Sequence, residues 1–198
     1  MKTVSVIDDE ASVREAVSML LETHGLTVRC FEGATQFLAA EFEPGCIVSD
    51  VRMPEVSGLD LLRTLQSQGD PRPVLLLTGH GDVELAVQAI KLGAFDFVEK
   101  PFNNDRFVAS VRNALVASEN SLKERLELED LRTRYESLSE RQRDTMRLLI
   151  RGLSNKEIGQ DLGISPRTVE IHRTWVMTKM NARSIADLVR MSMALGIE

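Results

Sequence analysis

Residues 47–54 read Ile47-Val48-Ser49-Asp50-Val51-Arg52-Met53-Pro54. The apolar run is short and rich in β-branched residues, and Pro44-Gly45 before it and Pro54 after it interrupt regular structure, which predicts a buried strand. Asp50 therefore lies where that strand reaches the surface, desolvated on one side and accessible on the other. A carboxylate in such a position is a candidate phosphate acceptor.

Working outward from this strand, apolar strands and amphipathic helices alternate five times before residue 117. The strands are nearly continuous in apolar residues, which is typical of a parallel sheet with helices on both faces. They are expected at residues 4–7, 26–31, 46–50, 74–78 and 94–98. We therefore predict an α/β domain with a doubly wound sheet.

The residues at the carboxyl ends of these strands carry the candidate chemistry. Parallel strands end at one common edge, and doubly wound sheets bind ligands there. In chain order the residues are Asp8, Asp9, Asp50, Thr78 and Lys100. Each alone has an ordinary structural explanation, such as a helix N-cap or a solvated lysine. Their occurrence together at four strand ends indicates a site.

Three carboxylates at one edge repel one another and remain ionised together only beside cations. Lys100 supplies one positive charge, and a hard divalent ion such as Mg²⁺ (or Mn²⁺) would supply the rest. The chain lacks a GxxxxGK[ST] phosphate loop, which argues against nucleotide binding. The set suits phosphoryl transfer onto Asp50, with Thr78 and Lys100 contacting phosphoryl oxygens and Gly79 leaving room for them.

Charge divides the chain unevenly. The chain has 24 Lys or Arg and 30 Asp or Glu. Residues 138–198 hold ten of the basic and seven of the acidic residues, so residues 1–137 hold 14 basic and 23 acidic residues. A net charge of −9 in residues 1–137 and +3 in residues 138–198 predicts two domains, the second with an anionic partner such as nucleic acid.

No apolar run reaches the roughly 20 residues of a membrane span, so a cytoplasmic protein is expected. Cys30 and Cys46 are expected to be inert core residues.

Residues 138–198 contain the start signals of three helices. Ser139 with Gln142 and Ser154 with Glu157 have capping-box spacing, and Ser165-Pro166 is an N-cap followed by proline at the first helical position. A fourth helix is expected at 185–195. The second and third helices, joined at Gly163, form a helix-turn-helix over about Ser154 to Arg173, although a small structural bundle is the alternative.

The third helix, from residue 166 to about 180, would enter the DNA major groove. The residues expected to face inward are Val169, His172, Val176 and Met180, and Trp175 is expected to pack. Basic residues suit phosphates, whereas Glu170, Ile171 and Thr174 suit base edges. An acid at 170 either accepts from cytosine N4 or discourages non-specific binding. The candidate DNA contacts are Asn155, Lys156, Arg167, Thr168, Glu170, Ile171, Arg173, Thr174 and Lys179.

The connecting residues 118–137 are expected to form a helical linker, because residues 104–138 contain neither Gly nor Pro. Leu128, Leu131, Tyr135 and Leu138 follow a 3-4-3 spacing that is compatible with a short dimer seam. The interpretation we favour is that this stripe packs against its own domains.

Residues 1–117 resemble the receiver domain of bacterial two-component response regulators. The resemblance rests on Asp8-Asp9, on Asp50 within Ser-Asp-Val-Arg-Met-Pro, and on Lys100-Pro101-Phe102. The runs 78–83 (Thr-Gly-His-Gly-Asp-Val) and 96–102 (Asp-Phe-Val-Glu-Lys-Pro-Phe) resemble the FixJ-like group. The resemblance implies a flavodoxin-like (βα)5 fold with sheet order 2-1-3-4-5.

The same resemblance implies roles for individual residues. Asp50 would be phosphorylated by a sensor histidine kinase, with Mg²⁺ held by Asp9, Asp50 and the backbone carbonyl of Arg52, and by Asp8 through water. Thr78 and Phe97 would form the conformational switch, and Phe97 lacks the hydroxyl of the tyrosine common there. Lys100-Pro101 would be cis. His80 and Arg52 stand where the family tunes the lifetime of the phosphoryl group.

Residues 138–198 resemble the LuxR-type DNA-binding domain, a four-helix unit, through the runs 138–142, 153–159 and 165–172. The order of the two domains is that of FixJ-like regulators. The resemblance implies binding to inverted-repeat promoter DNA as a homodimer formed through the last helix, and contact with RNA polymerase.

Two rival functions are compatible with part of the pattern. One is a phosphotransfer intermediate whose C-terminal domain binds protein. The other is a phosphatase of the haloacid type, but that class carries a second aspartate two residues after the nucleophile, where this chain has Arg52. We therefore expect a regulator rather than an enzyme.

Overall fold

The structure is a computed structural model that describes residues 2–79 and 83–197. The chain divides into two compact units, Met1–Leu122 and Lys123–Glu198. Among the described helices, none is both long enough and apolar enough to cross a bilayer.

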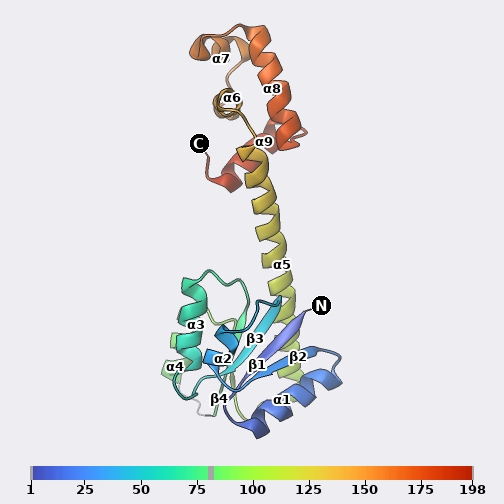
Figure 1. Ribbon diagram of the computed structural model, residues 1–198, viewed down its shortest axis with the longest axis vertical. Helices are drawn as coiled ribbons and strands as arrows, with labels where there is room; N and C mark the ends of the chain where they lie inside the picture. The colour runs from blue at the N-terminus through green and yellow to red at the C-terminus, as the bar shows by residue number, and fades with distance from the viewer. Residues whose placement is uncertain (1, 80–82, 198) are drawn as a thin grey trace. The chain divides into compact units, whose positions relative to one another are not determined.

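The first unit contains a five-stranded, all-parallel sheet, as the sequence pattern predicted (Figure 1). Its strand order is β2-β1-β3-β4-β5, as the family resemblance implied. Each strand is followed by a helix. In chain order the elements are β1 (Thr3–Ile7), α1 (Ala11–Thr23), β2 (Thr27–Phe31), α2 (Ala34–Leu38), β3 (Gly45–Asp50), α3 (Gly58–Ser67), β4 (Val74–Thr78), α4 (Val83–Lys91), β5 (Asp96–Glu99) and α5 (Asn104–Glu136).

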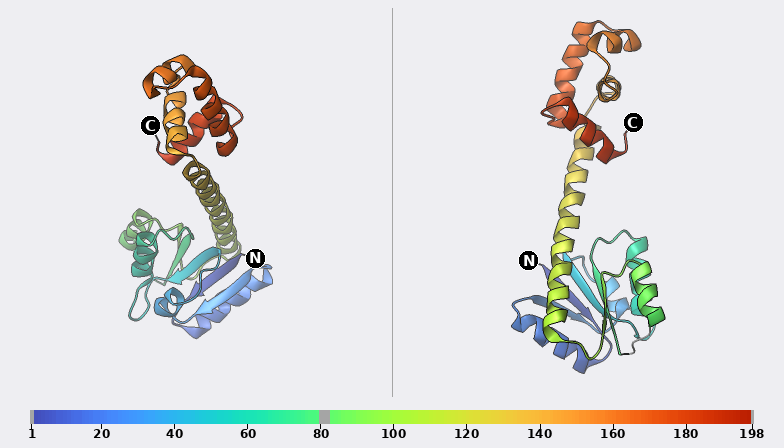
Figure 2. Two further views of the ribbon diagram at one scale, coloured as in Figure 1. Left: turned by 45° about the horizontal axis from the view of Figure 1, so that its top comes forward. Right: turned by 180° about the vertical axis from the view of Figure 1, so that it is seen from behind.

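Two apolar clusters cover the two faces of the sheet. Residues of α1 and α5, such as Leu21 and Phe107, pack on one face with Val48. Residues of α2, α3 and α4 pack on the other face with Ile47. Val48 and Ile47 are both fully buried although they point to opposite faces, which is why the strands are apolar without alternation. Figure 1 and both views of Figure 2 show helices on either side of the sheet.

The second unit contains α6 (Glu140–Ile150), α7 (Asn155–Leu162), α8 (Pro166–Met180) and α9 (Ile185–Leu195). Both predicted capping boxes form completely, and Ser165 caps α8 with Pro166 at its start. Leu131, Tyr135 and Leu138 pack with the core of this unit, so most of the apolar stripe is used within its own domain. The predicted domain boundaries at 117 and 137 lie in or beside the single helix α5 and remain predictions.

The two cysteines differ from the prediction in part. Cys46 is buried in β3, and burial raises the pKa of its thiol to about 12, so it is inert at neutral pH. Cys30 is exposed. Its strand, β2, pairs only with β1 and forms one edge of the sheet, so the apolar run around it is not covered on both faces.

Candidate functional site

The register of the central strands brings two of the predicted carboxylates together. Ile7 of β1 pairs with Ser49 of β3, so the next residues, Asp8 just after β1 and Asp50 at the end of β3, lie side by side. Both are buried, with relative exposures of 3% and 9%. Two acids so far removed from water need a compensating charge.

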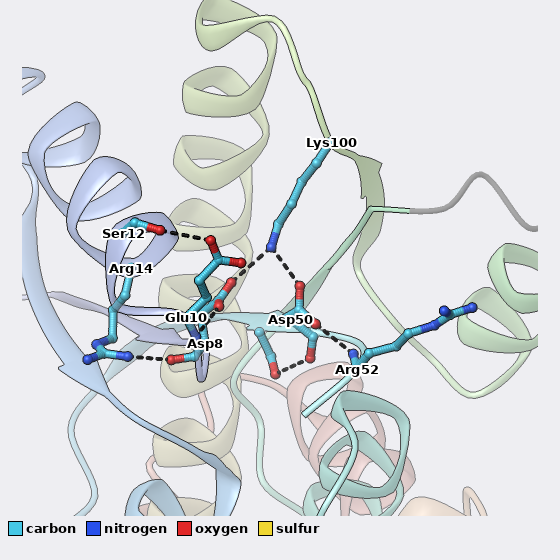
Figure 3. A network of polar contacts seen from close by, with 8 residues as sticks. Asp8, Glu10, Ser12, Arg14, Asp50, Arg52 and Lys100 are labelled. Carbon is cyan, nitrogen blue, oxygen red and sulfur yellow. Dashed lines mark hydrogen bonds and ion pairs between the residues drawn. The ribbon is translucent and has the colours of Figure 1, made fainter. Parts of the chain in front are cut away.

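Lys100 supplies that charge. Its Nζ donates to Asp8 Oδ2 at 2.9 Å and to Asp50 Oδ1 at 2.6 Å, so one ammonium bridges the carboxylates of two strands (Figure 3). Burial lowers the pKa of Lys100, but the hydrogen bonds and charges of Asp50 and Asp8 outweigh that effect and raise the pKa above its usual value. The ammonium is therefore charged throughout the physiological range.

Backbone contacts fix the same two carboxylates. Glu10 N donates to Asp8 Oδ1 at 2.9 Å, and Arg52 N donates to Asp50 Oδ2 at 2.6 Å. The Arg14 guanidinium donates to the carbonyl oxygen of Asp8 at 2.7 Å (Figure 3). Each carboxylate thus has one oxygen on Lys100 and the other on the main chain.

Asp9 does not join this pair. It is exposed, and within residues 2–79 and 83–197 no three His, Cys, Asp or Glu side chains lie close enough together to hold a metal ion. The sequence predicted three convergent acids, and the structure brings together two. The physical reason is charge: one ammonium compensates only one carboxylate in full, and a third acid beside the pair would add repulsion that solvent exposure avoids.

The other predicted residues of this edge lie around the pair. Thr78 is buried at the end of β4, and its carbonyl oxygen accepts from Lys100 N at 2.7 Å. Gly79 is exposed, and a Cβ built there meets no described atom within 4 Å. Lys100-Pro101 is cis, as predicted. Phe97 is half-buried in β5, and His80 lies outside the described residues.

Gly58 is a site residue that the sequence interpretation missed. It is the first residue of α3 and lies next to Asp50, the candidate phosphoacceptor. A Cβ built on Gly58 would lie 2.2 Å from the carbonyl oxygen of Asp50. Its N–H donates to the Val51 carbonyl at 2.9 Å. The available signal in the sequence was a glycine at the start of a helix shortly after Met53-Pro54. Its role is evident only from the close approach of the Gly58 and Asp50 backbones.

The predicted helix-turn-helix is formed by α7 and α8. Gly163 ends α7 in the left-handed conformation, with φ 68°. Gly159, within α7, is required for the close packing of the turn, because a Cβ there would lie 2.7 Å from the Ile164 carbonyl oxygen. Val169, Val176 and Met180 of α8 are buried, as expected of its inner face, and His172 is half-buried.

The predicted DNA contacts fall into two groups. Lys156, Arg167, Glu170, Ile171 and Thr174 are exposed, and Asn155, Thr168 and Arg173 are half-buried. Lys179 differs from the prediction that it faces phosphates. Its Nζ donates to the Ser137 carbonyl at 2.7 Å and to Gln142 Oε1 at 3.0 Å, because the end of α8 lies against the start of α6.

Trp175 also differs from the prediction. Its side chain is 52% exposed on α8 rather than packed, one helical turn after Ile171, which is equally exposed. Position 175 directly precedes the buried Val176, and a step of one residue turns it about 100° away from the core.

A doubly wound sheet with a lysine bridging two carboxylates at its carboxyl edge, followed by a helix-turn-helix unit, defines the class: a receiver domain joined to a DNA-binding domain. Family comparisons agree. Residues 4–112 match the response regulator receiver domain, and residues 136–192 match the bacterial regulatory proteins of the LuxR family.

Whole-chain comparisons extend the match. The chain is 47% identical to the transcriptional regulatory protein FixJ of Bradyrhizobium diazoefficiens over 98% of this chain and 96% of that protein. It is 45% identical to the C4-dicarboxylate transport transcriptional regulatory protein DctR of Rhodobacter capsulatus over 96% and 98%. The solved structure of the response regulator StyR matches with a TM-score of 0.86 at 37% identity, covering 97% and 98%. The chain belongs to the FixJ-like group of two-component response regulators.

Proposed function

We propose that Asp50 accepts a phosphoryl group from a sensor histidine kinase and that this modification controls promoter binding by the LuxR-type domain. The observation that carries the proposal is the Lys100 Nζ shared between Asp8 Oδ2 and Asp50 Oδ1. It leaves the acceptor carboxylate ionised, oriented and beside a cation that can contact the oxygens of an incoming phosphoryl group.

In the transfer step a carboxylate oxygen of Asp50 forms a bond to the phosphorus of the kinase phosphohistidine. The P–N bond breaks, and the released imidazole takes up a proton from solvent. Lys100 and the Thr78 hydroxyl stabilise the charge on the phosphoryl oxygens, and Gly79 leaves the space they occupy. The product is an acyl phosphate on Asp50, and the same groups serve its later hydrolysis. We propose no other enzymatic activity.

The oxygen-rich donor set fits a hard divalent cation. Asp8 and Asp50 already present carboxylates side by side, with Asp9 exposed next to them. We propose that these residues and the backbone carbonyl of Arg52 hold Mg²⁺ or Mn²⁺. The ion, when bound, supplies positive charge to the acceptor and the phosphoryl oxygens.

The output follows from the second unit. Phosphorylation repositions Thr78 and Phe97, and Phe97 is only partly buried where it packs against the apolar cluster on the α3 and α4 side of the sheet. Receiver residues 1–117, linker residues 118–137 and DNA-binding residues 138–198 then form a cytoplasmic homodimer on an inverted-repeat promoter, where RNA polymerase is a further partner.

The test is phosphorylation of the full chain by a small phosphodonor with Mg²⁺. We expect an increase in intact mass of one phosphoryl group for the wild type and for Glu41→Gln, an exposed acid on the loop after α2, but none for Asp50→Asn. The modified wild type should retain duplex DNA with an affinity that falls as salt rises.

Modification of Asp50→Asn to the wild-type level would overturn the phosphoacceptor assignment. DNA retention without a salt dependence, or no retention after full phosphorylation, would favour the rival function of a phosphotransfer intermediate with a protein partner.

A further inference from the structure

We propose that Glu170 is a specificity-determining residue that reads cytosine in the operator. This inference rests on the proposed DNA binding and adds to it the base that one side chain recognises. It begins from the difference between Glu170 and its neighbours on the outer face of α8.

Three of those neighbours form hydrogen bonds within the chain, whereas Arg167 pairs with no described residue. Arg173 donates to Asn155 Oδ1 at 3.5 Å, Thr174 Oγ1 donates to the Glu170 backbone carbonyl at 2.9 Å, and the hydroxyl groups of Thr168 and Ser165 are 2.9 Å apart. The Glu170 carboxylate has no hydrogen bond or ion pair with any described residue, and it is exposed. It is therefore available to a partner outside the chain.

The position of Glu170 suits base contact. It is the fifth residue of α8, in the N-terminal part from which recognition helices reach base edges. It also lines an open hollow of about 320 Å³ with Asn155 at the start of α7 and with Arg173, Thr174, Met177 and Thr178 of α8. Glu170 thus borders a recess between the two helices of the motif.

The chemistry of the major groove then selects the base. An ionised carboxylate only accepts hydrogen bonds. Guanine presents two acceptors and thymine one acceptor with a methyl group, so both leave the carboxylate without a donor. Adenine offers the N6 amino group but places the N7 acceptor beside it, where it repels a second carboxylate oxygen. Cytosine offers the N4 amino group without an adjacent acceptor.

The competing explanation is that Glu170 merely repels DNA phosphates and so lowers non-specific binding. The two explanations predict different results. Repulsion changes the affinity for every sequence alike, whereas recognition changes the preference at one base pair of each half-site.

The test selects operators from a pool of random duplexes with the full chain activated by BeF₃⁻. Wild type is compared with Glu170→Ala, Glu170→Gln and the control Glu136→Gln, an exposed acid at the end of α5 that removes the same charge outside the motif. When the selected sequences are aligned, we expect one position per half-site to be occupied mainly by cytosine for wild type and control (the cytosine column). Glu170→Ala should lose it, and Glu170→Gln should shift it toward adenine, which an amide pairs in two places.

A thermodynamic cycle completes the test. Replacing that C·G pair by T·A should weaken wild-type binding about tenfold and binding by Glu170→Ala less than twofold. A cytosine column that survives in both Glu170 variants, or a uniform gain in affinity with unchanged preferences, would overturn the inference. Failure of the activated wild type to retain any duplex would instead overturn the proposed function.

Discussion

The acidic edge of the sheet and the outer face of α8 handle charge in opposite ways. At the edge, Asp8, Asp50 and Lys100 are buried or half-buried, and the one ammonium pairs with both carboxylates within the chain. On α8, Arg167 and Glu170 are exposed, and neither side chain pairs with a described residue. A site that performs chemistry on a small group is preorganised by internal contacts. A surface that reads a long partner leaves its charges for that partner.

Removal of Lys100 should have the largest effect, and it tests whether the acidic edge depends on its internal cation. Lys100→Met deprives Asp8 and Asp50 of their shared cation, and we expect phosphorylation by a small donor to slow about 100-fold or more. Lys100→Arg should recover part of the rate because it keeps the charge. The phosphorylation rates of both variants are measured by stopping the reaction at successive times and determining the intact mass of the protein. A rate for Lys100→Met within threefold of wild type would show that the preorganised cation is dispensable.

Gly58→Ala should have the next largest effect. The added Cβ would lie 2.2 Å from the Asp50 carbonyl oxygen, so α3 and the acceptor loop must separate. We expect a loss of about 2–3 kcal/mol in the free energy of unfolding, measured by denaturant titration, and slower phosphorylation. Gly33→Ala is the control, because its Cβ would meet no described atom within 4 Å and its φ is extended; its stability should change by less than about 0.5 kcal/mol.

Lys179 and Arg167 sharpen the comparison on the DNA-binding side. Lys179→Gln removes internal bonds to Ser137 and Gln142 and should cost about 1 kcal/mol of stability, with the salt dependence of DNA binding unchanged. Arg167→Gln should leave stability unchanged and reduce the salt slope by about one. Thermal unfolding and binding at several salt concentrations give both quantities, and the reverse pattern would show that Lys179 is the phosphate contact.

The smallest expected effect is one of pH. Because the pKa of Lys100 is raised in the folded state, its stabilising contribution is fully present below the ordinary lysine pKa and is lost as pH rises through the folded value. The difference in unfolding free energy between wild type and Lys100→Met should therefore be constant from pH 7 to 9 and shrink above about pH 10.5. A difference that shrinks near neutrality would contradict the raised pKa.

Much of the fold could be predicted because it depends on local patterns. The alternation of apolar strands with helices gave the parallel sheet, and the ends of those strands named Asp8, Asp50, Thr78 and Lys100. Capping residues located the starts of α6, α7 and α8 because their hydrogen bonds span only three residues. The resemblance to a known family supplied the sheet order.

The remaining features depend on contacts between distant residues. Lys179 was assigned to the outer face of α8 because the sequence does not show that Ser137 and Gln142 lie beside it. That Asp8 is buried beside Asp50 while Asp9 stays exposed could not be predicted, because adjacency in sequence does not reveal which of two neighbours turns inward. Gly58 was overlooked because only tertiary packing places it 2.2 Å (as a built Cβ) from the Asp50 carbonyl.

The exposure of Trp175 has a practical consequence. It is the only tryptophan in the chain, so the indole emission of the whole protein arises from one point on α8. A ligand that covers this face should shift the emission to shorter wavelength without any attached dye. Residues 1–122 contain no tryptophan, so circular dichroism or a newly introduced fluorophore is needed to follow the unfolding of that unit directly.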